Sequence, residues 1–130
     1  MNIYTPIVSI VLYITSLIAP VDVKEISIAS DGQVMVFQRI DADHWKATTP
    51  AGTVLEYQWT GGEFIERMND SFIKEKIKDH LALPINFDHQ PIQLKRTPMS
   101  FKIEKHEELI IFRIEEDDSP ESQMRVSWAR

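Results

Sequence analysis

The chain contains no cysteine and only four glycines among its 130 residues. Without cysteine it has no disulfide framework, no thiol nucleophile and no cysteine-ligated zinc. The glycines form no phosphate-binding pattern, because Gly61-Gly62 stands between two apolar runs, where a hairpin turn accounts for it. No Gly-x-Ser-x-Gly motif marks a serine nucleophile. The sequence therefore assigns no catalytic residue.

Basic charge is also scarce. Lysine and arginine together number 14, against 20 aspartates and glutamates, so the formal net charge is −6. A surface of this sign repels the phosphate backbone of DNA and RNA, and binding would require a compensating basic patch. The lysines between residues 74 and 78 alternate with acidic side chains, and Lys95-Arg96 is only a pair. We expect no nucleic-acid partner.

Residues 1–21 carry no charged side chain. Pro6 and Pro20 enclose thirteen positions, a length that is typical of the apolar region of a signal peptide, although no lysine or arginine precedes it. A membrane-spanning helix needs about 20 apolar residues, which this segment reaches only if it includes both prolines. The many β-branched residues would also suit a segment buried in the core. These three interpretations stay open.

The first two interpretations agree that the rest of the chain is exported. We therefore expect residues 1–21 to be a signal peptide or a membrane anchor, and residues 22–130 to form a single β-rich domain. That domain would be secreted, periplasmic or membrane-anchored outside the cytoplasm. Contact with a membrane is expected only through the N-terminal segment.

A turn signal returns about every ten residues between residues 24 and 68. Glycine and aspartate favour such turns, because glycine adopts positive φ freely and aspartate bonds nearby backbone groups. The turn signals are Asp31-Gly32, Asp41-Ala42-Asp43, Ala51-Gly52 and Gly61-Gly62. The spacing predicts an antiparallel meander of five strands. These strands are expected at residues 24–29, 33–40, 45–49, 53–60 and 63–68.

One helix is predicted after the meander. Asn69, Asp70 and Ser71 are residue types that cap helix N-termini. Apolar residues then recur near a 3.6-residue period, at Phe72, Ile73, Ile77 and Leu81. Pro84 would end the helix. We expect this helix to cover the apolar face of the preceding strands.

Strands are expected to resume after Pro91, with strong alternation at residues 99–104 and 124–128 and an apolar run at 109–114. Residues 86–90 and the acidic stretch 115–122 are expected to be loops. The predicted fold is β-rich α+β: a five-strand antiparallel meander, one packed helix, and two or three further antiparallel strands. The sequence leaves open whether the sheet closes into a barrel.

The histidines show no metal-ligand spacing, such as two histidines four residues apart on a helix. They are His44, His80, His89 and His106. Asp41 and Asp43 lie near His44, but turn formation accounts for both. We expect no metal and no cofactor. A hydrolase or metal enzyme assembled from scattered histidines and carboxylates is the third functional hypothesis.

The aromatic residues of the meander are the candidate binding residues. Trp45, Tyr57 and Trp59 fall on neighbouring predicted strands, and Tyr57 and Trp59 share one face. This set forms either part of the core or the wall of a binding site. The leading hypothesis is a non-enzymatic, exported or membrane-tethered module that acts by protein–protein contact. The alternative is a carrier of a small ligand, with an aromatic-lined cavity inside a closed sheet.

Overall fold

The computed structural model describes residues 5–30, 32–87, 91–95, 100–115 and 123–129, and the account below concerns these residues. They form one α-helix, one short 3-10 helix and ten strands. In chain order these are α1 (Thr5–Ile18), β1 (Glu25–Ser30), β2 (Gln33–Asp41), β3 (His44–Thr48), β4 (Val54–Thr60), β5 (Glu63–Met68), β6 (Ser71–Lys76), η1 (Ile77–Asp79), β7 (Ile92–Gln93), β8 (Ser100–Lys105), β9 (Leu109–Ile114) and β10 (Gln123–Ser127).

All ten strands belong to one antiparallel sheet, in the order β6-β5-β4-β3-β2-β1-β10-β9-β8-β7. The sheet consists of two meanders, β1–β6 and β7–β10, which are joined where β1 pairs with β10. The predicted five-strand meander is confirmed as β1–β5. Gly61 and Gly62 have φ values of 59° and 83°, and positive φ at both central residues is what a two-residue type I′ hairpin requires.

The helix predicted from residue 72 to Pro84 is wrong. Strand β6 occupies the start of this segment and pairs with β5 along all six of its residues, and only Ile77–Asp79 are helical. The predicted capping residues Asn69 and Asp70 instead form the turn between β5 and β6, with Asn69 at a φ of 52°. Asparagine and aspartate serve both helix caps and hairpin turns. Here the hairpin forms because β6 extends the hydrogen-bonded ladder of the sheet beside β5.

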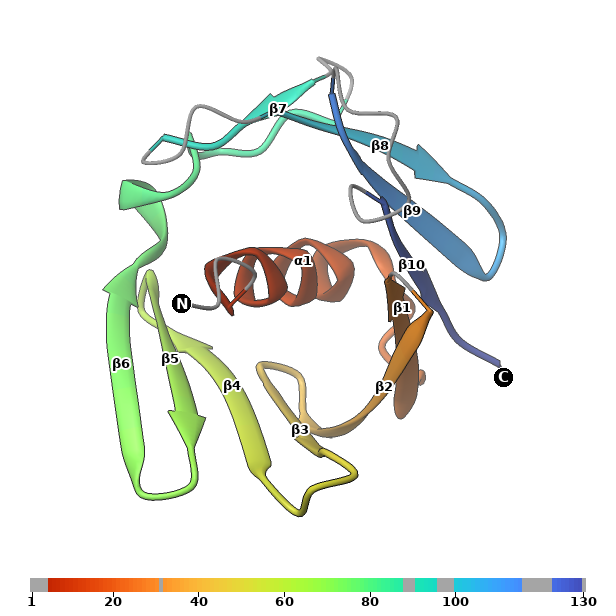
Figure 1. Ribbon diagram of the computed structural model, residues 1–130. Helices are drawn as coiled ribbons and strands as arrows, with labels where there is room; N and C mark the ends of the chain where they lie inside the picture. Colours follow the sequence, from red (N-terminus) through yellow and green to blue (C-terminus); the bar gives the residue numbers. More distant parts are fainter. Residues whose placement is uncertain (1–4, 31, 88–90, 96–99, 116–122, 130) are drawn as a thin grey trace.

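The helix that covers the apolar face of the sheet is α1, at the other end of the chain. The sheet curves around α1, which lies inside it (Figure 1). Val11, Leu12 and Ile14 are completely buried there. The segment interpreted above as a signal peptide, an anchor or a core segment thus fills the interior. Within the described ranges, no helix is both long and apolar enough to cross a membrane.

The sheet wraps most of the way around α1 but is not closed. Strands β6 and β7 are its two ends. Beyond them the chain makes an isolated antiparallel bridge between Leu81 and Leu94. The amide N–H of Lys95 also donates a 2.9 Å hydrogen bond to the carbonyl oxygen of His80. Closure was the question that the sequence left open, and the answer is a strongly curved open sheet.

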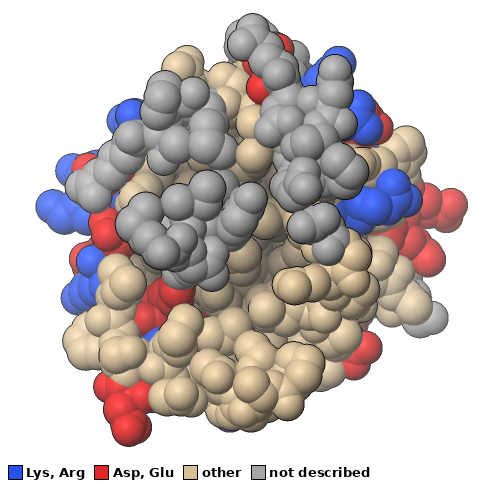
Figure 2. All heavy atoms as spheres, in the orientation of Figure 1, with Lys and Arg blue, Asp and Glu red and all other residues tan. Residues whose placement is uncertain are grey.

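The second meander follows the prediction closely. Strands β8, β9 and β10 cover the predicted segments, and residues 106–108 connect β8 to β9. Met99, residues 88–90 of the first predicted loop and residues 116–122 of the second lie outside the described residues. In the view of Figure 2, charged side chains lie mostly around the periphery of the molecule, over the outer side of the sheet. The apolar faces are therefore turned inward, toward α1.

Candidate functional site

The three aromatic residues singled out above lie together on the interior face of the sheet. Trp45 is completely buried, and Tyr57 and Trp59 are nearly so. Trp45 on β3 is the direct cross-strand partner of Tyr57 on β4. Trp59 stands opposite Phe64 on β5. Tyr57 and Trp59 share one face as predicted, and Trp45 lies on the same face, which is the concave one.

Two charged residues extend this set into a row that crosses four strands. Arg39 on β2 is the partner of Trp45, and Glu66 on β5 is the partner of Tyr57. We call Arg39, Trp45, Tyr57 and Glu66 the polar-aromatic row. Since neighbouring strands lie about 4.8 Å apart, the row spans about 14 Å. It carries a cation at one end and a carboxyl group at the other.

Sequence reasoning missed Arg39 and Glu66. A signal was present, because each is in phase with an apolar residue two positions earlier, Phe37 and Phe64 respectively. A charged residue on the apolar side of an alternating strand has to find a partner in the interior. The sequence does not reveal that partner, which comes from residues far away in the chain.

That partner is α1 and the turn that follows it. The Ser9 hydroxyl donates a hydrogen bond of 3.2 Å to Oε2 of Glu66. The Tyr13 ring packs edge-on against Trp59, with 5.8 Å between ring centroids. Residues 9, 13 and 16 fall on one face of a helix. The third of them, Ser16, accepts a 2.8 Å hydrogen bond from Nε1 of Trp45.

These contacts place α1 across the strands, along the polar-aromatic row. Successive contacts from Ser9 onward are made with β5, β4 and β3. At 1.5 Å per residue, the chain from Ser9 to Pro20 would cover about 17 Å if it were all helical, close to the length of the row. One face of α1 therefore matches the polar groups of the sheet.

Arg39 binds the turn after α1. Its Nη1 donates to the carbonyl oxygens of Pro20 at 3.1 Å, Val21 at 3.4 Å and Val23 at 3.1 Å. The guanidinium carbon lies 4.7 Å from the centre of the Trp45 ring, a cation–π contact. Nε of Arg39 is buried, and the described part of the chain offers it no hydrogen-bond partner. Burial lowers the pKa of Arg39, an effect that Asp43 opposes, and the group stays cationic.

The other end of the row favours neutral side chains. Burial raises the pKa of Glu66, and the hydrogen bond from Ser9 offsets part of that rise. Burial, and then the neighbouring Glu66, raise the pKa of the Tyr57 phenol, which is therefore neutral at physiological pH. The row thus runs from a fixed positive charge at Arg39 to a carboxyl group whose protonated form is stabilised.

The opposite wall of the interior is apolar. It consists of β1, β10, β9 and β8, and buried residues stand opposite each other from strand to strand, as Val126 does with both Ile28 and Ile110. Phe101 and Phe112 pack edge to face, with 6.1 Å between ring centroids. None of the buried polar or charged residues found in the described ranges belongs to these strands. In the part of the chain that the structure describes, side-chain hydrogen bonds to α1 come from the wall formed by β2–β5.

The described histidines are spread over the molecule, and each pairs with a different carboxylate. The Nε2–Oε2 distances are 3.0 Å for His44–Glu56, 3.3 Å for His80–Glu75 and 3.9 Å for His106–Glu104. His89 lies outside the described residues. Among the residues searched, no three or more histidine or carboxylate side chains gather as a metal site would require.

Turn formation accounts for the acidic pair near His44. The side-chain Oδ1 of Asp41 accepts a 3.0 Å hydrogen bond from the backbone N–H of Asp43. An aspartate that bonds the backbone two residues ahead is a common turn device. The interpretation of Asp41 as a turn residue is therefore supported, and Asp43 contributes its backbone N–H to the same turn.

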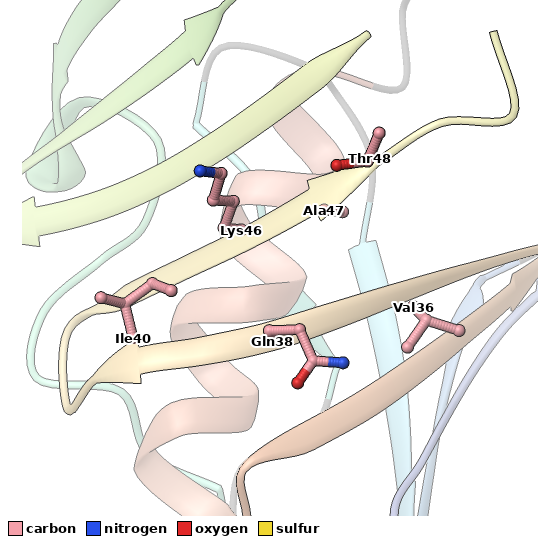
Figure 3. A pocket seen from close by; sticks show the side chains of 6 residues that line it. All are labelled: Val36, Gln38, Ile40, Lys46, Ala47 and Thr48. Carbon is pink, nitrogen blue, oxygen red and sulfur yellow. The ribbon is translucent and has the colours of Figure 1, made fainter. Parts of the chain in front are cut away.

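The outer face of β2 and β3 carries a second, shallower feature. An open hollow lies at these two strands, and Figure 3 labels the side chains that line it. Its volume is about 380 Å³. The lining residues are Val36, Gln38, Ile40, Lys46, Ala47 and Thr48. Val34, Val36 and Ile40 are exposed along this face of β2.

Comparisons with protein-family models, with curated proteins and with solved structures found no match for this chain. The site is therefore interpreted from its own geometry. The interior of the sheet is filled by α1, and the wall that contacts α1 has an aromatic floor with a cation at one end.

Proposed function

We propose that residues 22–130 form an exported, non-enzymatic carrier that binds a hydrophobic ligand on the concave face of its sheet. The ligand would lie where α1 lies in this structure. One observation carries the proposal: the sheet curves around a single apolar helix of 14 residues, and the sequence of that helix also fits the apolar region of a signal peptide. Removal of this segment during export would leave the apolar interior without its contents.

The volume that α1 occupies is large enough for such a ligand. A helix of 14 residues is about 21 Å long. Treated as a cylinder about 10 Å wide, it fills on the order of 1,600 Å³. Ligand sites commonly measure about 300–1,000 Å³. The interior could therefore shrink considerably after the loss of α1 and still hold a ligand.

The residues around this volume also favour a carrier. Trp45, Tyr57 and Trp59 line one wall, and aromatic side chains are frequent in ligand sites. The opposite wall is apolar, as described above. An elongated apolar molecule would restore the hydrophobic contacts that α1 makes, and a polar end would satisfy the charged end of the row.

Protein–protein contact, the leading hypothesis from the sequence, is the second candidate function. Exposed apolar residues on β2 and β6 favour it. Val34, Val36 and Ile40 form an exposed row on β2, and Phe72 and Ile73 are exposed on β6. β6 is an edge strand, and an exposed edge can pair with a strand of another protein. The concave face is the stronger candidate because it encloses much more apolar surface.

The exported form of the protein provides the test. The full chain with a C-terminal tag would be expressed in a bacterial host that exports it, and the exported fraction would be purified and weighed by mass spectrometry. We expect the mass to lack about twenty N-terminal residues. Titration with hexadecan-1-ol should then change tryptophan emission saturably, because Trp45 and Trp59 line the site.

A matched control is the full-length chain, produced in the cytoplasm without processing. With α1 in place, its tryptophan emission should not respond saturably to the same alcohol. An exported protein that keeps residues 1–21, or that shows no saturable response after losing them, would contradict the carrier function.

A further inference from the structure

The polar-aromatic row ends at Arg39, a side chain that stays ionised. A cation at this position indicates the chemical group that the ligand places there. We infer that the ligand is a long-chain carboxylate whose head group binds Arg39. This inference rests on the proposed carrier function and specifies its ligand. It follows from the hydrogen bonds of Arg39, from its charge and from the direction in which the row runs.

Two of the three acceptors of Arg39 lie in the last two residues of the segment 1–21. Cleavage after Val21 would remove the carbonyl oxygens of Pro20 and Val21 and leave that of Val23, whereas cleavage after Ala19 would leave all three. Nε of Arg39 is already without a partner among the described residues. A guanidinium with unused donors in a partly buried site needs new acceptors. The two oxygens of a carboxylate fit the fork of donors that arginine presents.

The charge of Arg39 is available to a ligand. Asp43 acts on Arg39 electrostatically, but the ion pairs found among the described residues do not include Arg39. The Trp45 ring, 4.7 Å from the guanidinium carbon, holds the group against the floor of the site. A carboxylate would therefore meet a cation that is already oriented and would displace no existing ion pair.

The rest of the site suits a long apolar chain. From Arg39 the row continues over Trp45 and Tyr57, and the apolar wall faces it across the interior. Glu66 lies about 14 Å from Arg39 along the row, three strand spacings away. A negative charge on Glu66 would repel an anionic head group at that end of the row, and it acts much more weakly at the Arg39 end. The head group is thereby directed to one end of the row.

The test compares two ligands of equal chain length on the exported protein. After removal of endogenous lipid, the protein is titrated with hexadecanoate and with hexadecan-1-ol at about pH 8, where the carboxylate is ionised. Charge-assisted hydrogen bonds should make hexadecanoate bind about ten- to a hundredfold more tightly. Arg39→Gln should abolish that preference, because the carboxylate loses a charge-assisted contact whereas the alcohol loses only a weaker hydrogen bond.

Arg125→Gln is the matched control, because Arg125 is an exposed arginine on β10. This variant should keep the full preference for hexadecanoate. Equal affinity of the unaltered protein for both ligands would overturn the carboxylate inference and leave the carrier function standing. Binding of neither ligand would overturn the carrier function itself.

A second variant covers the case in which Arg39→Gln does not fold. Arg39→Lys keeps the positive charge but loses the planar fork of donors, so the preference for hexadecanoate should fall several-fold. An unchanged preference in Arg39→Lys would contradict a two-oxygen contact with the guanidinium.

Discussion

The two walls of the interior differ in kind. Strands β2–β5 present Arg39, Trp45, Tyr57 and Glu66, and each of the first three lies directly opposite the next across neighbouring strands. Strands β1 and β8–β10 present apolar side chains of the core. Hydrophobic contact is non-directional, whereas hydrogen bonds and charges fix orientation. The first wall can therefore select and orient an occupant, and the second supplies burial.

The contacts of α1 follow this division. Its polar and ring contacts, from Ser9, Tyr13 and Ser16, are made with β3, β4 and β5. The apolar residues Val11, Leu12 and Ile14 are completely buried between the walls. A ligand in the place of α1 would make polar and ring contacts with the first wall and would bury its apolar part between the two walls.

Large-to-small substitutions on both walls should cost about the same stability. Trp45 on the first wall and Phe112 on the second are both completely buried. In the full-length chain, Trp45→Ala and Phe112→Ala should each lower the free energy of unfolding by about 3–5 kcal/mol. Denaturant titrations measure this quantity. A loss below about 1 kcal/mol for either variant would contradict the placement of that residue in the core.

Within α1, the cost should depend on which side of the helix is changed. Leu12 is completely buried and Leu17 is 53% exposed. In the full-length chain, Leu12→Ala should destabilise the fold by about 2–5 kcal/mol, whereas Leu17→Ala should stay within about 0.5 kcal/mol. Equal effects would mean that α1 does not lie between the two walls.

Glu66 should make the free energy of unfolding depend on pH. Its pKa is raised in the folded protein, so the folded state holds the proton more tightly than the unfolded state does. The free energy of unfolding should therefore fall as the pH rises from the unfolded pKa of about 4.3 through the raised folded value, and stay constant above it. Glu66→Gln should remove this decrease.

The comparison for Glu66 is Glu63→Gln on the same strand. Glu63 is partly exposed, and its Oε1 lies 3.6 Å from the ammonium group of Lys74. This variant should keep the decrease seen in the unaltered protein, measured by denaturant unfolding between about pH 4 and pH 8. An identical pH profile for Glu66→Gln and the unaltered protein would show that Glu66 is not buried as described.

The smallest effect is expected on the outer side of the first wall. Val36 is exposed, and its neighbour Phe37 is completely buried. Val36→Ser should change the free energy of unfolding by no more than about 0.5 kcal/mol and should leave ligand affinity unchanged. If the outer face instead binds a protein partner, this variant should weaken that contact. A large loss of stability would reverse the assignment of inner and outer faces.

Local patterns predicted most of the strands correctly. Turns that need positive φ, such as Gly61-Gly62, and strict alternation in β4 and β10 are properties of short segments, so they can be read from the sequence. The failure at β6 arose because Asn69 and Asp70 are suited to two local structures. Only pairing with β5 decides between them, and such pairing is not a local property.

The site was only partly predictable from the sequence, because it too depends on contacts between residues that are far apart in the chain. Trp45 and Tyr57 stand out as large aromatics in alternating strands. Arg39 and Glu66 become meaningful only when their distant partners are known. The apolar N-terminal segment was assigned to export ahead of burial, although both require the same hydrophobic residues. Its place inside the sheet depends on the curvature of ten strands.

Mass spectrometry of the exported protein under non-denaturing conditions tests most directly whether a ligand takes the place of α1. We expect a protein that lacks about twenty N-terminal residues and carries a non-covalent adduct, which solvent extraction releases as a long-chain carboxylic acid. A full-length exported protein without an adduct would show instead that α1 is the permanent content of the sheet.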